Sequence, residues 1–519
     1  MLTHRQSFFI YFILSIIAVY FVYSPAIHIP FYHHDVYKYS TGGFHQSCYS
    51  DQGYKHLFKL GRPFSAVLDC YNNKIANTLA SMSYLRIFCA LLIAVTASVF
   101  AMWMYAIGAG FLTAFCLSSA IFFLPAMQTA IIMGATTLIV PILLALAAYY
   151  FISQHSILIG IFGVGCLMAA FFTYPALAAF YLIPIFVLLL FQPLKDWKRT
   201  RITILRDIII FAGCSAIYFI AIKYFQSGYL AGVPTNYQFN VNFHFLDRLL
   251  FIYKKLPQLW NIDFWVRQSI LVNLIIIGGL IAAAVSSRHK SFNVLLQSTV
   301  AAIILFLLGC SVLLAVPSVD IPAGRVIFVA QAMLILLMYW SINKISDLFP
   351  QEKIKLITWF VGILFVAGAV FANFNVAKSA LNDRLELNYV TFMLANYFAQ
   401  PGVKLERVHI IAPNFVNFNG LTRGDDIFND NSSRYAGDMA NIVNTALLQM
   451  AERHSFSVHN CIFSNTEEEL FFDKEVACIK TASRDDIVVT YSWPNKPVYV
   501  SPNTLVINMN NLGVLLNHK

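Results

Sequence analysis

The apolar run at residues 8–23, FFIYFILSIIAVYFVY, is followed closely by the polar stretch at residues 31–39, FYHHDVYKY. The first run approaches the length of about 20 residues that an α-helix needs to cross a bilayer. Because no small-residue cleavage site follows it, we interpret it as a membrane helix with a cytoplasmic N-terminus, not as a signal peptide. Ionisable side chains beside a membrane helix are costly and tend to mark a functional site. The two segments therefore predict a membrane helix with a polar site at its C-terminal end.

The composition of the chain is that of a polytopic membrane protein. Of its 519 residues, 59% are hydrophobic and only 12% are charged, whereas soluble domains have about 25% charged residues. The mean hydropathy is +0.67. The net charge of +10 could indicate a nucleic-acid partner, but the basic residues gather in short connectors between apolar runs, as the positive-inside rule describes. We therefore expect membrane lipid around the chain and no nucleic acid.

The apolar runs predict about eleven transmembrane helices. Pro125 and Pro175 are expected to break two of the longer apolar blocks, because proline cannot continue a helix. The runs lie at residues 8–23, 84–107, 110–127, 130–152, 156–173, 174–191, 208–225, 268–285, 293–316, 326–342 and 356–374.

The basic connectors predict the topology. An odd number of helices places the N-terminus in the cytoplasm and the C-terminus outside, and it puts the basic segments 192–207, 286–290 and 343–355 on the cytoplasmic side. Residues 27–83 and 226–267 then form external loops, the second with an interfacial amphipathic helix near residues 245–259.

The domain organisation follows from the last apolar run. Residues 1–375 form the transmembrane domain, and residues 376–519 form a separate soluble domain. In the second domain we expect buried strands at 408–412, 487–491 and 504–509 and a helix at 436–454, which favours an α/β or α+β fold. It contains no phosphate-binding glycine loop, zinc-ligand spacing or G-x-S-x-G element.

Four cysteines outside the apolar runs predict two disulfides in an oxidising compartment. Cys48 and Cys70 share the first external loop, and Cys461 and Cys478 share the C-terminal region. Four free thiols are the alternative. The other five cysteines lie in apolar runs, where cysteine behaves as a small hydrophobic residue.

The external loops provide the groups needed for sugar transfer from a polyprenyl phosphate. Nucleotide sugars are absent outside the cytoplasm, so a sugar donor there must be carried by a lipid. The acceptor hydroxyl needs a general base, for which Asp35 is the candidate, with His34 orienting the carboxylate or the sugar. Tyr37 and Tyr39 could stack on a sugar ring, although tyrosine is also common at membrane interfaces.

The departing phosphate requires cations to stabilise its charge. Arg62 lies between Gly61 and Pro63, which fix the backbone beside the guanidinium, and Lys38 and Arg325 are the other candidate phosphate ligands. The adjacent His33 and His34 lack metal-ligand spacing, so no metal cofactor is predicted.

Five further acidic residues are candidates for a functional role. Asp51 and Asp69, in the first loop, are interpreted as structural. The acidic cluster Asp425, Asp426 and Asp430 is interpreted as a solvated loop.

An acidic motif directly after the first helix of a polytopic membrane protein resembles the GT-C glycosyltransferases. Within that class, residues 34–38 (HDVYK) followed by residues 61–63 (GRP) resemble the serotype-converting glucosyltransferases of bacteria and their phages, which modify O-antigen. Members of that family have an Asp-Asp pair in this place, whereas here His34 occupies the first acidic position. The resemblance implies an enzyme of the bacterial inner membrane that takes glucose from undecaprenyl phosphate and delivers it to a lipid-linked or polymeric glycan. It also implies a companion flippase and a cytoplasmic-face synthase of the donor.

Three other functions remain open at this stage. The chain could be an O-antigen polymerase or another enzyme acting on polyprenyl-linked glycans. It could be a transporter or flippase, although few charges interrupt its apolar runs and no internal repeat is evident. It could also be a receptor or structural protein whose C-terminal domain is the working part.

Overall fold

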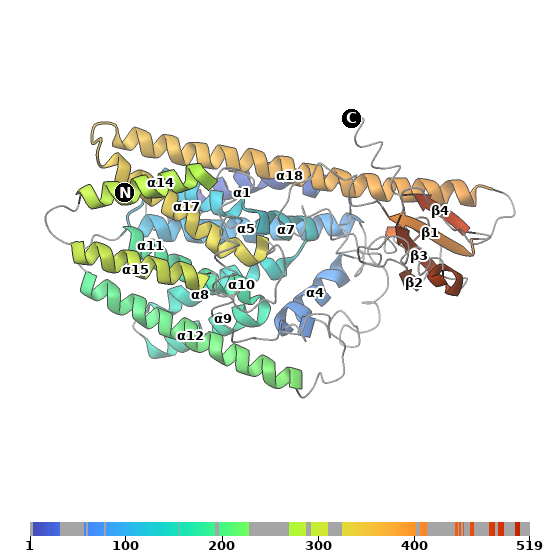
Figure 1. Cartoon of the computed structure of the whole chain (residues 1–519), viewed down its shortest axis with the longest axis horizontal. Helices are drawn as coiled ribbons and strands as arrows, with labels where there is room; N and C mark the ends of the chain where they lie inside the picture. The colour runs from blue at the N-terminus through green and yellow to red at the C-terminus, as the bar shows by residue number, and fades with distance from the viewer. Residues whose placement is uncertain are drawn as a thin grey trace. The chain divides into compact units, whose positions relative to one another are not determined.

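A computed structural model describes two compact units in this chain (Figure 1). The first comprises residues within Met1–Ile27, Tyr49–Asn72 and Tyr84–Val376, and the second comprises residues within His28–Cys48, Asn73–Ser83 and Ala377–Lys519. The residues that the structure describes are 4–31, 57–58, 61–76, 79–154, 156–191, 197–227, 269–286, 292–309, 324–400, 405–412, 442–444, 446–447, 450, 457–460, 477–482, 486–491 and 504–508.

The first unit is built from helices, and the axes of its long helices are roughly parallel or antiparallel to one another (Figure 1). In chain order the helices of the described residues are α1 (His4–His28), α4 (Pro63–Ile75), α5 (Leu79–Ala106), α6 (Phe111–Phe122), α7 (Pro125–Met133), η2 (Thr136–Leu138), α8 (Val140–Ile152), α9 (Ile157–Thr173), α10 (Pro175–Ala178), η3 (Ala179–Tyr181), α11 (Leu182–Phe191), α12 (Trp197–Ser227), α14 (Ser269–Ser286), α15 (Phe292–Gly309), α17 (Gly324–Ser346) and α18 (Lys353–Phe398).

Several of these helices are suited to a membrane. Among the described residues, five helices are long and apolar enough to cross a bilayer, or six if the bent pair α6 and α7 is one span. They present large apolar side chains outward: Ile220 of α12 is 70% exposed and Trp359 of α18 is 72% exposed. Exposed apolar faces of this extent are stable in lipid and unfavourable in water. These helices are compatible with a multi-pass membrane protein, as the composition predicts.

Two helical interruptions occur where the sequence predicts them. The axis bends by 60° between α6 and α7, and Pro125 is the first residue of α7. The second break lies at Tyr174, whose backbone is extended, directly before Pro175 at the start of α10. Proline lacks an N–H and clashes with the preceding helical turn, but it is well suited to the first turn of a new helix. The expectation that Pro125 and Pro175 are breakers is confirmed.

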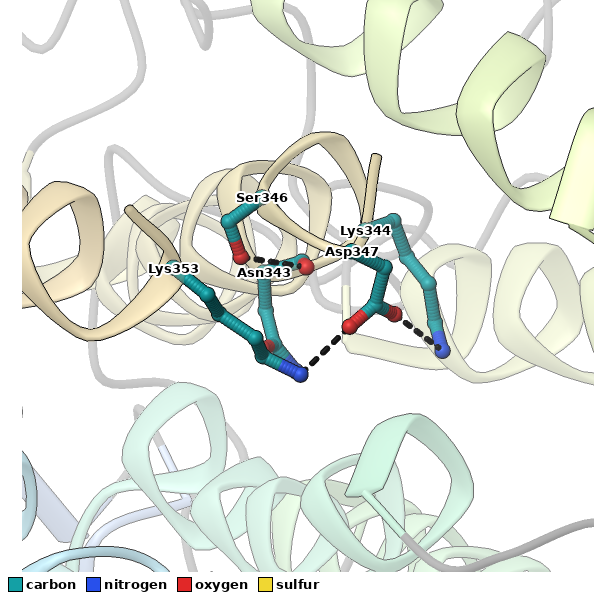
Figure 2. A network of polar contacts seen from close by, with 5 residues as sticks. All are labelled: Asn343, Lys344, Ser346, Asp347 and Lys353. Atoms are coloured by element: carbon teal, nitrogen blue, oxygen red, sulfur yellow. Dashed lines mark hydrogen bonds and ion pairs between the residues drawn. The ribbon is translucent and has the colours of Figure 1, made fainter. Parts of the chain in front are cut away.

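The connector between α17 and α18 is held by a local charge network (Figure 2). The Asp347 carboxylate forms an ion pair with Lys344 at 3.6 Å and accepts a hydrogen bond from Lys353. The Ser346 hydroxyl donates a hydrogen bond to the Asn343 carbonyl at 2.7 Å. Because these side chains are partly exposed, each ion pair contributes about 1 kcal/mol or less. The network closes the turn that reverses the chain between the two helices.

The last helix continues well beyond the last apolar run. The sequence suggests an apolar segment ending at residue 374, but α18 has 46 residues and ends at Phe398. At 1.5 Å per residue its length is about 69 Å, roughly twice the hydrocarbon thickness of a bilayer. The residues that continue the helix include Asp383 and Glu386, which are both buried. A chain cut at residue 375 would therefore end inside a helix.

The second unit contains a parallel sheet of four strands. Its strands are β1 (Arg407–Ala412), β2 (Ser457–Asn460), β3 (Asp486–Tyr491) and β4 (Thr504–Asn508), in the order β2-β3-β1-β4. The register pairs Val408 with Ile487 and with Leu505. The strands expected at 408–412, 487–491 and 504–509 are confirmed, and β2 was missed. Of the helix expected at 436–454, the described residues 442–444 and 446–447 are helical.

The central strand β1 is covered on both faces, as is usual in a parallel sheet. Val408, His409 and Ile410 are all buried. The second unit is also joined by side-chain to backbone bonds. The Arg407 guanidinium donates to the Ala482 carbonyl at 2.6 Å, and the Tyr389 hydroxyl of α18 donates to the Asn508 carbonyl of β4 at 3.1 Å. The last turns of α18 therefore belong to this unit.

Candidate functional site

Most of the site residues predicted from the sequence lie outside the described residues. These are Asp35, His34, Lys38, Tyr37, Tyr39, Cys48 and Cys461. The interfacial helix expected at 245–259 also lies outside them. Arg62, Arg325, Cys70 and Cys478 are described, and Arg62 has the most informative surroundings.

The Gly-Arg-Pro element forms a tight turn at the start of α4. Gly61 has a positive φ of 77°, a conformation that residues with a Cβ rarely adopt. The Gly61 and Arg62 amides donate to the carbonyls of Phe58 and Leu57, and the Arg62 carbonyl accepts from Ala66 in the first turn of α4. Pro63 is the first residue of the helix. The backbone on both sides of Arg62 is therefore fixed, as the sequence suggests.

This turn is packed closely against α12. A Cβ added at Gly61 would lie 2.0 Å from Ile222 Cδ1 and 2.9 Å from the Tyr218 hydroxyl oxygen. The Tyr218 hydroxyl donates a hydrogen bond to the Gly61 carbonyl at 3.2 Å. On the other side, the buried Ser65 hydroxyl donates to the Thr173 carbonyl at the end of α9. These contacts hold the start of α4 between α9 and α12.

The guanidinium of Arg62 lies over an aromatic ring. Its Cζ is 4.1 Å from the centroid of the Tyr174 ring, which is the geometry of a cation–π contact. The Arg62 Nε is buried and has no hydrogen-bond partner among the described residues. Buried guanidinium groups normally have their donors paired. Arg62 is thus held in one direction with donor capacity left over, as an anion site requires.

Asp69, on α4, is a carboxylate whose charge interacts with that of Arg62. The side chains of Thr137 and Asn72 donate hydrogen bonds to it, and Asn72 Nδ2 also donates to Thr136 Oγ1 at 2.8 Å. Burial raises the pKa of Asp69 to about 7, and the two hydrogen bonds and the Arg62 guanidinium oppose that rise. A pKa in this range allows the Asp69 carboxyl to change its protonation state near neutral pH.

The region around Asp69 is anchored by a buried arginine on α5. Arg86 is fully buried, and its guanidinium donates to the Ile132 carbonyl near the end of α7 and to the Ala26 carbonyl of α1. These carbonyls lie in the last turns of their helices, where intrahelical donors are lacking. Arg86 thereby fixes the end of α7, from which the chain passes through Gly134, with a φ of 62°, to the Thr136–Thr137 turn.

Arg325 is the second residue of α17 and is half-buried. Its role as a phosphate ligand stays a prediction. In the described part of the chain, no group of three or more His, Cys, Asp or Glu side chains could hold a metal ion.

The cysteines divide into two chemical states. Cys70 and Cys478 are disulfide-bonded. The pairings Cys48–Cys70 and Cys461–Cys478 stay predictions. Cys89, Cys116, Cys166 and Cys214, all in helices, are free thiols.

Sequence reasoning missed the environment of Asp69 and assigned this residue a structural role. One local signal was present: Asp69 follows Arg62 by seven residues, about two helical turns, so the two side chains are expected on the same side of the segment. Tyr174, Thr136 and Thr137 could not be associated with them from spacing, because those residues come from other parts of the fold.

Comparison of the chain with protein-family models, curated proteins and solved structures finds no match. The resemblance to serotype-converting glucosyltransferases therefore stays a prediction, and the function must be argued from the residues themselves.

Proposed function

We propose that this chain is an inverting glycosyltransferase. It transfers a hexose from a polyprenyl phosphate to a hydroxyl of lipopolysaccharide O-antigen or a related surface glycan. Glucose is the sugar that the family resemblance implies.

The observation that carries this proposal is the arrangement of Arg62. A guanidinium held over the Tyr174 ring, with a buried Nε that has no hydrogen-bond partner among the described residues, is prepared to bind an anion. The helices around it are apolar on their outer faces, so an anion that reaches Arg62 from the membrane is a lipid headgroup. A polyprenyl phosphate combines a lipid tail, a phosphate and a sugar.

In the proposed reaction the acceptor hydroxyl oxygen attacks the anomeric carbon as the bond from that carbon to the phosphate oxygen breaks. Asp35 accepts the proton of the hydroxyl, and His34 orients this base. Arg62, with Lys38 and Arg325, stabilises the charge on the departing phosphate. Tyr37 and Tyr39 contact the sugar.

The proposed topology places this chemistry on the periplasmic face of the bacterial inner membrane. Eleven spans leave the N-terminus in the cytoplasm and an α/β domain in the periplasm, where both disulfides can form. A synthase on the cytoplasmic face and a flippase then supply the donor.

Transfer of labelled hexose from its polyprenyl phosphate to O-antigen, in vesicles containing the full chain, tests the proposal. We expect Asp35→Asn and Arg62→Gln each to lower kcat/KM by about 100-fold or more. Arg201→Gln is the matched control, because Arg201 is an exposed arginine at the start of α12. Full activity in both site variants at normal protein levels would refute the assignment, as would an O-antigen sugar composition that is unchanged when the chain is removed.

A lipid-linked sugar transporter is the second candidate, and the interrupted helices favour it. Transporters often bind substrate where discontinuous helices expose backbone groups inside the membrane. Here α6 and α7 are separated by a 60° bend, and Gln128 of α7 is fully buried with its Oε1 lacking a partner among the described residues. Movement of a polyprenyl phosphate sugar across proteoliposomes without acceptor would support this function over transfer.

A further inference from the structure

Arg62, the residue before α4, and Asp69, about two turns further along, have opposite charges that interact with each other. Asp69 interacts electrostatically with Arg62, yet none of the ion pairs between described side chains joins the two. The guanidinium instead lies against the Tyr174 ring, and the carboxyl is hydrogen-bonded by Thr137 and Asn72. Each group is thus held by its own neighbours at a distance where the charge of one influences the other.

We propose that Asp69 is a positioning residue that makes anion binding at Arg62 dependent on pH. When the Asp69 carboxyl is protonated, the full positive charge of Arg62 acts on a bound phosphate. When Asp69 is ionised, its negative charge opposes the phosphate. The inference rests on the proposed function for the identity of the ligand, the phosphodiester of a polyprenyl phosphate sugar.

The surroundings of Asp69 explain why it can change its charge. Among the described residues, the charged and titratable groups that interact with Asp69 are Arg62, directly before α4, and Cys89 on α5. Tyr174 and Tyr218 interact with Arg62, and Arg86 interacts with Cys89. Only the two arginines carry a charge at neutral pH. Arg86 is occupied by the Ile132 and Ala26 carbonyls. Burial therefore dominates, and it favours the neutral carboxyl.

The coupling has a chemical consequence for a transferase. The donor is a phosphodiester with one negative charge, whereas the product is a phosphomonoester with up to two charges near neutral pH. A neighbouring carboxyl that takes up a proton when phosphate binds, and releases it when phosphate leaves, adjusts the charge of the site to its occupant. Linkage requires that phosphate binding raises the proton affinity of Asp69 by the same factor by which protonation of Asp69 strengthens phosphate binding.

The test measures binding of a short isoprenyl methyl phosphodiester to the full chain in phosphatidylcholine nanodiscs between pH 5.5 and 8.5. This probe keeps a single negative charge across that range, so it adds no titration of its own. With the carboxyl titrating at about 7, we expect the affinity of the natural chain to fall by up to about tenfold from pH 6 to pH 8. Asp69→Asn should bind the probe at every pH with the affinity that the natural chain has at the acidic end of the range.

Two further variants test the inference even if the Asp69→Asn variant does not fold. Arg62→Gln should bind weakly at every pH. Thr137→Val removes a hydrogen bond that favours the ionised carboxyl, so the midpoint of the affinity profile should move to higher pH. A flat profile in the natural chain with binding that still depends on Arg62 would overturn this inference alone. Absence of probe binding at any pH would overturn the proposed function and this inference with it.

Discussion

The Cζ of Arg62 lies 4.1 Å from the centroid of the Tyr174 ring. This contact joins the residue before α4 to the residue at the break between α9 and α10. Neither partner could have been paired with the other from the sequence, since they belong to segments far apart in the chain. The contact fixes the orientation of the guanidinium, and the Nε stays buried without a hydrogen-bond partner in the described part of the chain.

Replacing the ring should weaken phosphate binding without removing the charge. A cation–π contact contributes about 0.5–2 kcal/mol, so Tyr174→Leu should weaken binding of the isoprenyl phosphodiester by about twofold to thirtyfold at pH 6. Tyr174→Phe keeps an aromatic face and should bind nearly as the natural chain does. Isothermal titration in nanodiscs measures both, and equal affinity of Tyr174→Leu and the natural chain would show that the ring does not position Arg62.

The turn at Gly61 should be intolerant of any side chain. Gly61→Ala combines a positive φ with a Cβ 2.0 Å from Ile222 Cδ1. Gly108→Ala is the matched control, because Gly108 also has a positive φ, of 103°, but its added Cβ meets nothing within 4 Å.

We expect Gly108→Ala to lower the free energy of unfolding by about 1 kcal/mol, from backbone strain alone. Gly61→Ala should lower it by about 1–3 kcal/mol more, from overpacking. Thermal unfolding followed by tryptophan fluorescence compares the two. Equal melting temperatures would mean that the close approach of α4 to α12 is absent.

The second unit should lose stability in acid because of His409. Burial and the neighbouring Arg407 guanidinium lower the pKa of His409 to about 4, from an ordinary value of 6.5. Between these values the unfolded state binds more protons than the folded state, so the free energy of unfolding rises with pH. The contribution, on the order of 3 kcal/mol, is complete above about pH 6.5 and is lost as pH falls through 4.

Hydrogen exchange of the β1 amides in the full chain, corrected for intrinsic rates, measures this dependence. Protection should decrease from pH 6.5 to pH 4. His409→Gln, which cannot take up the proton, should reduce that decrease. An identical pH dependence in the variant would show that another group is responsible.

The two ends of α18 should face different compartments. Glu352→Cys places a thiol at an exposed position beside the basic connector, and Gln400→Cys places one just after the end of the helix. A membrane-impermeant maleimide should label Gln400→Cys in intact spheroplasts and Glu352→Cys only after permeabilisation. The natural chain is the background control, and the opposite labelling pattern would reverse the proposed topology.

Local rules explain which parts of the fold were predictable. The breaks before Pro125 and Pro175 follow from the missing N–H of proline, and the strands near 408, 487 and 504 follow from short apolar runs rich in β-branched residues. The strand Ser457–Asn460 was missed because its sequence, SVHN, has little β propensity. Its pairing with β3 gives it extended structure.

The candidate site was predictable only in part. Gly61, Arg62 and Pro63 form a local motif, and their turn has the rigidity that the motif suggests. One partner of Asp69, Thr137, lies on the turn between α7 and α8, whose position follows from the hydrogen bond of Arg86 to the Ile132 carbonyl. No spacing rule connects residues whose proximity depends on how several helices pack.

The break at Tyr174 allows the outward face of α9 and the Tyr174 ring to be oriented independently, which one continuous helix would not allow. Upstream, α9 presents side chains such as Ile157 and Phe162 outward, where many apolar residues are interchangeable. In an unbroken helix, any change in the tilt or rotation of that surface would turn the Tyr174 ring with it. With an extended residue between α9 and α10, substitutions on the exposed face of α9 can be accommodated without turning the Tyr174 ring away from the guanidinium of Arg62.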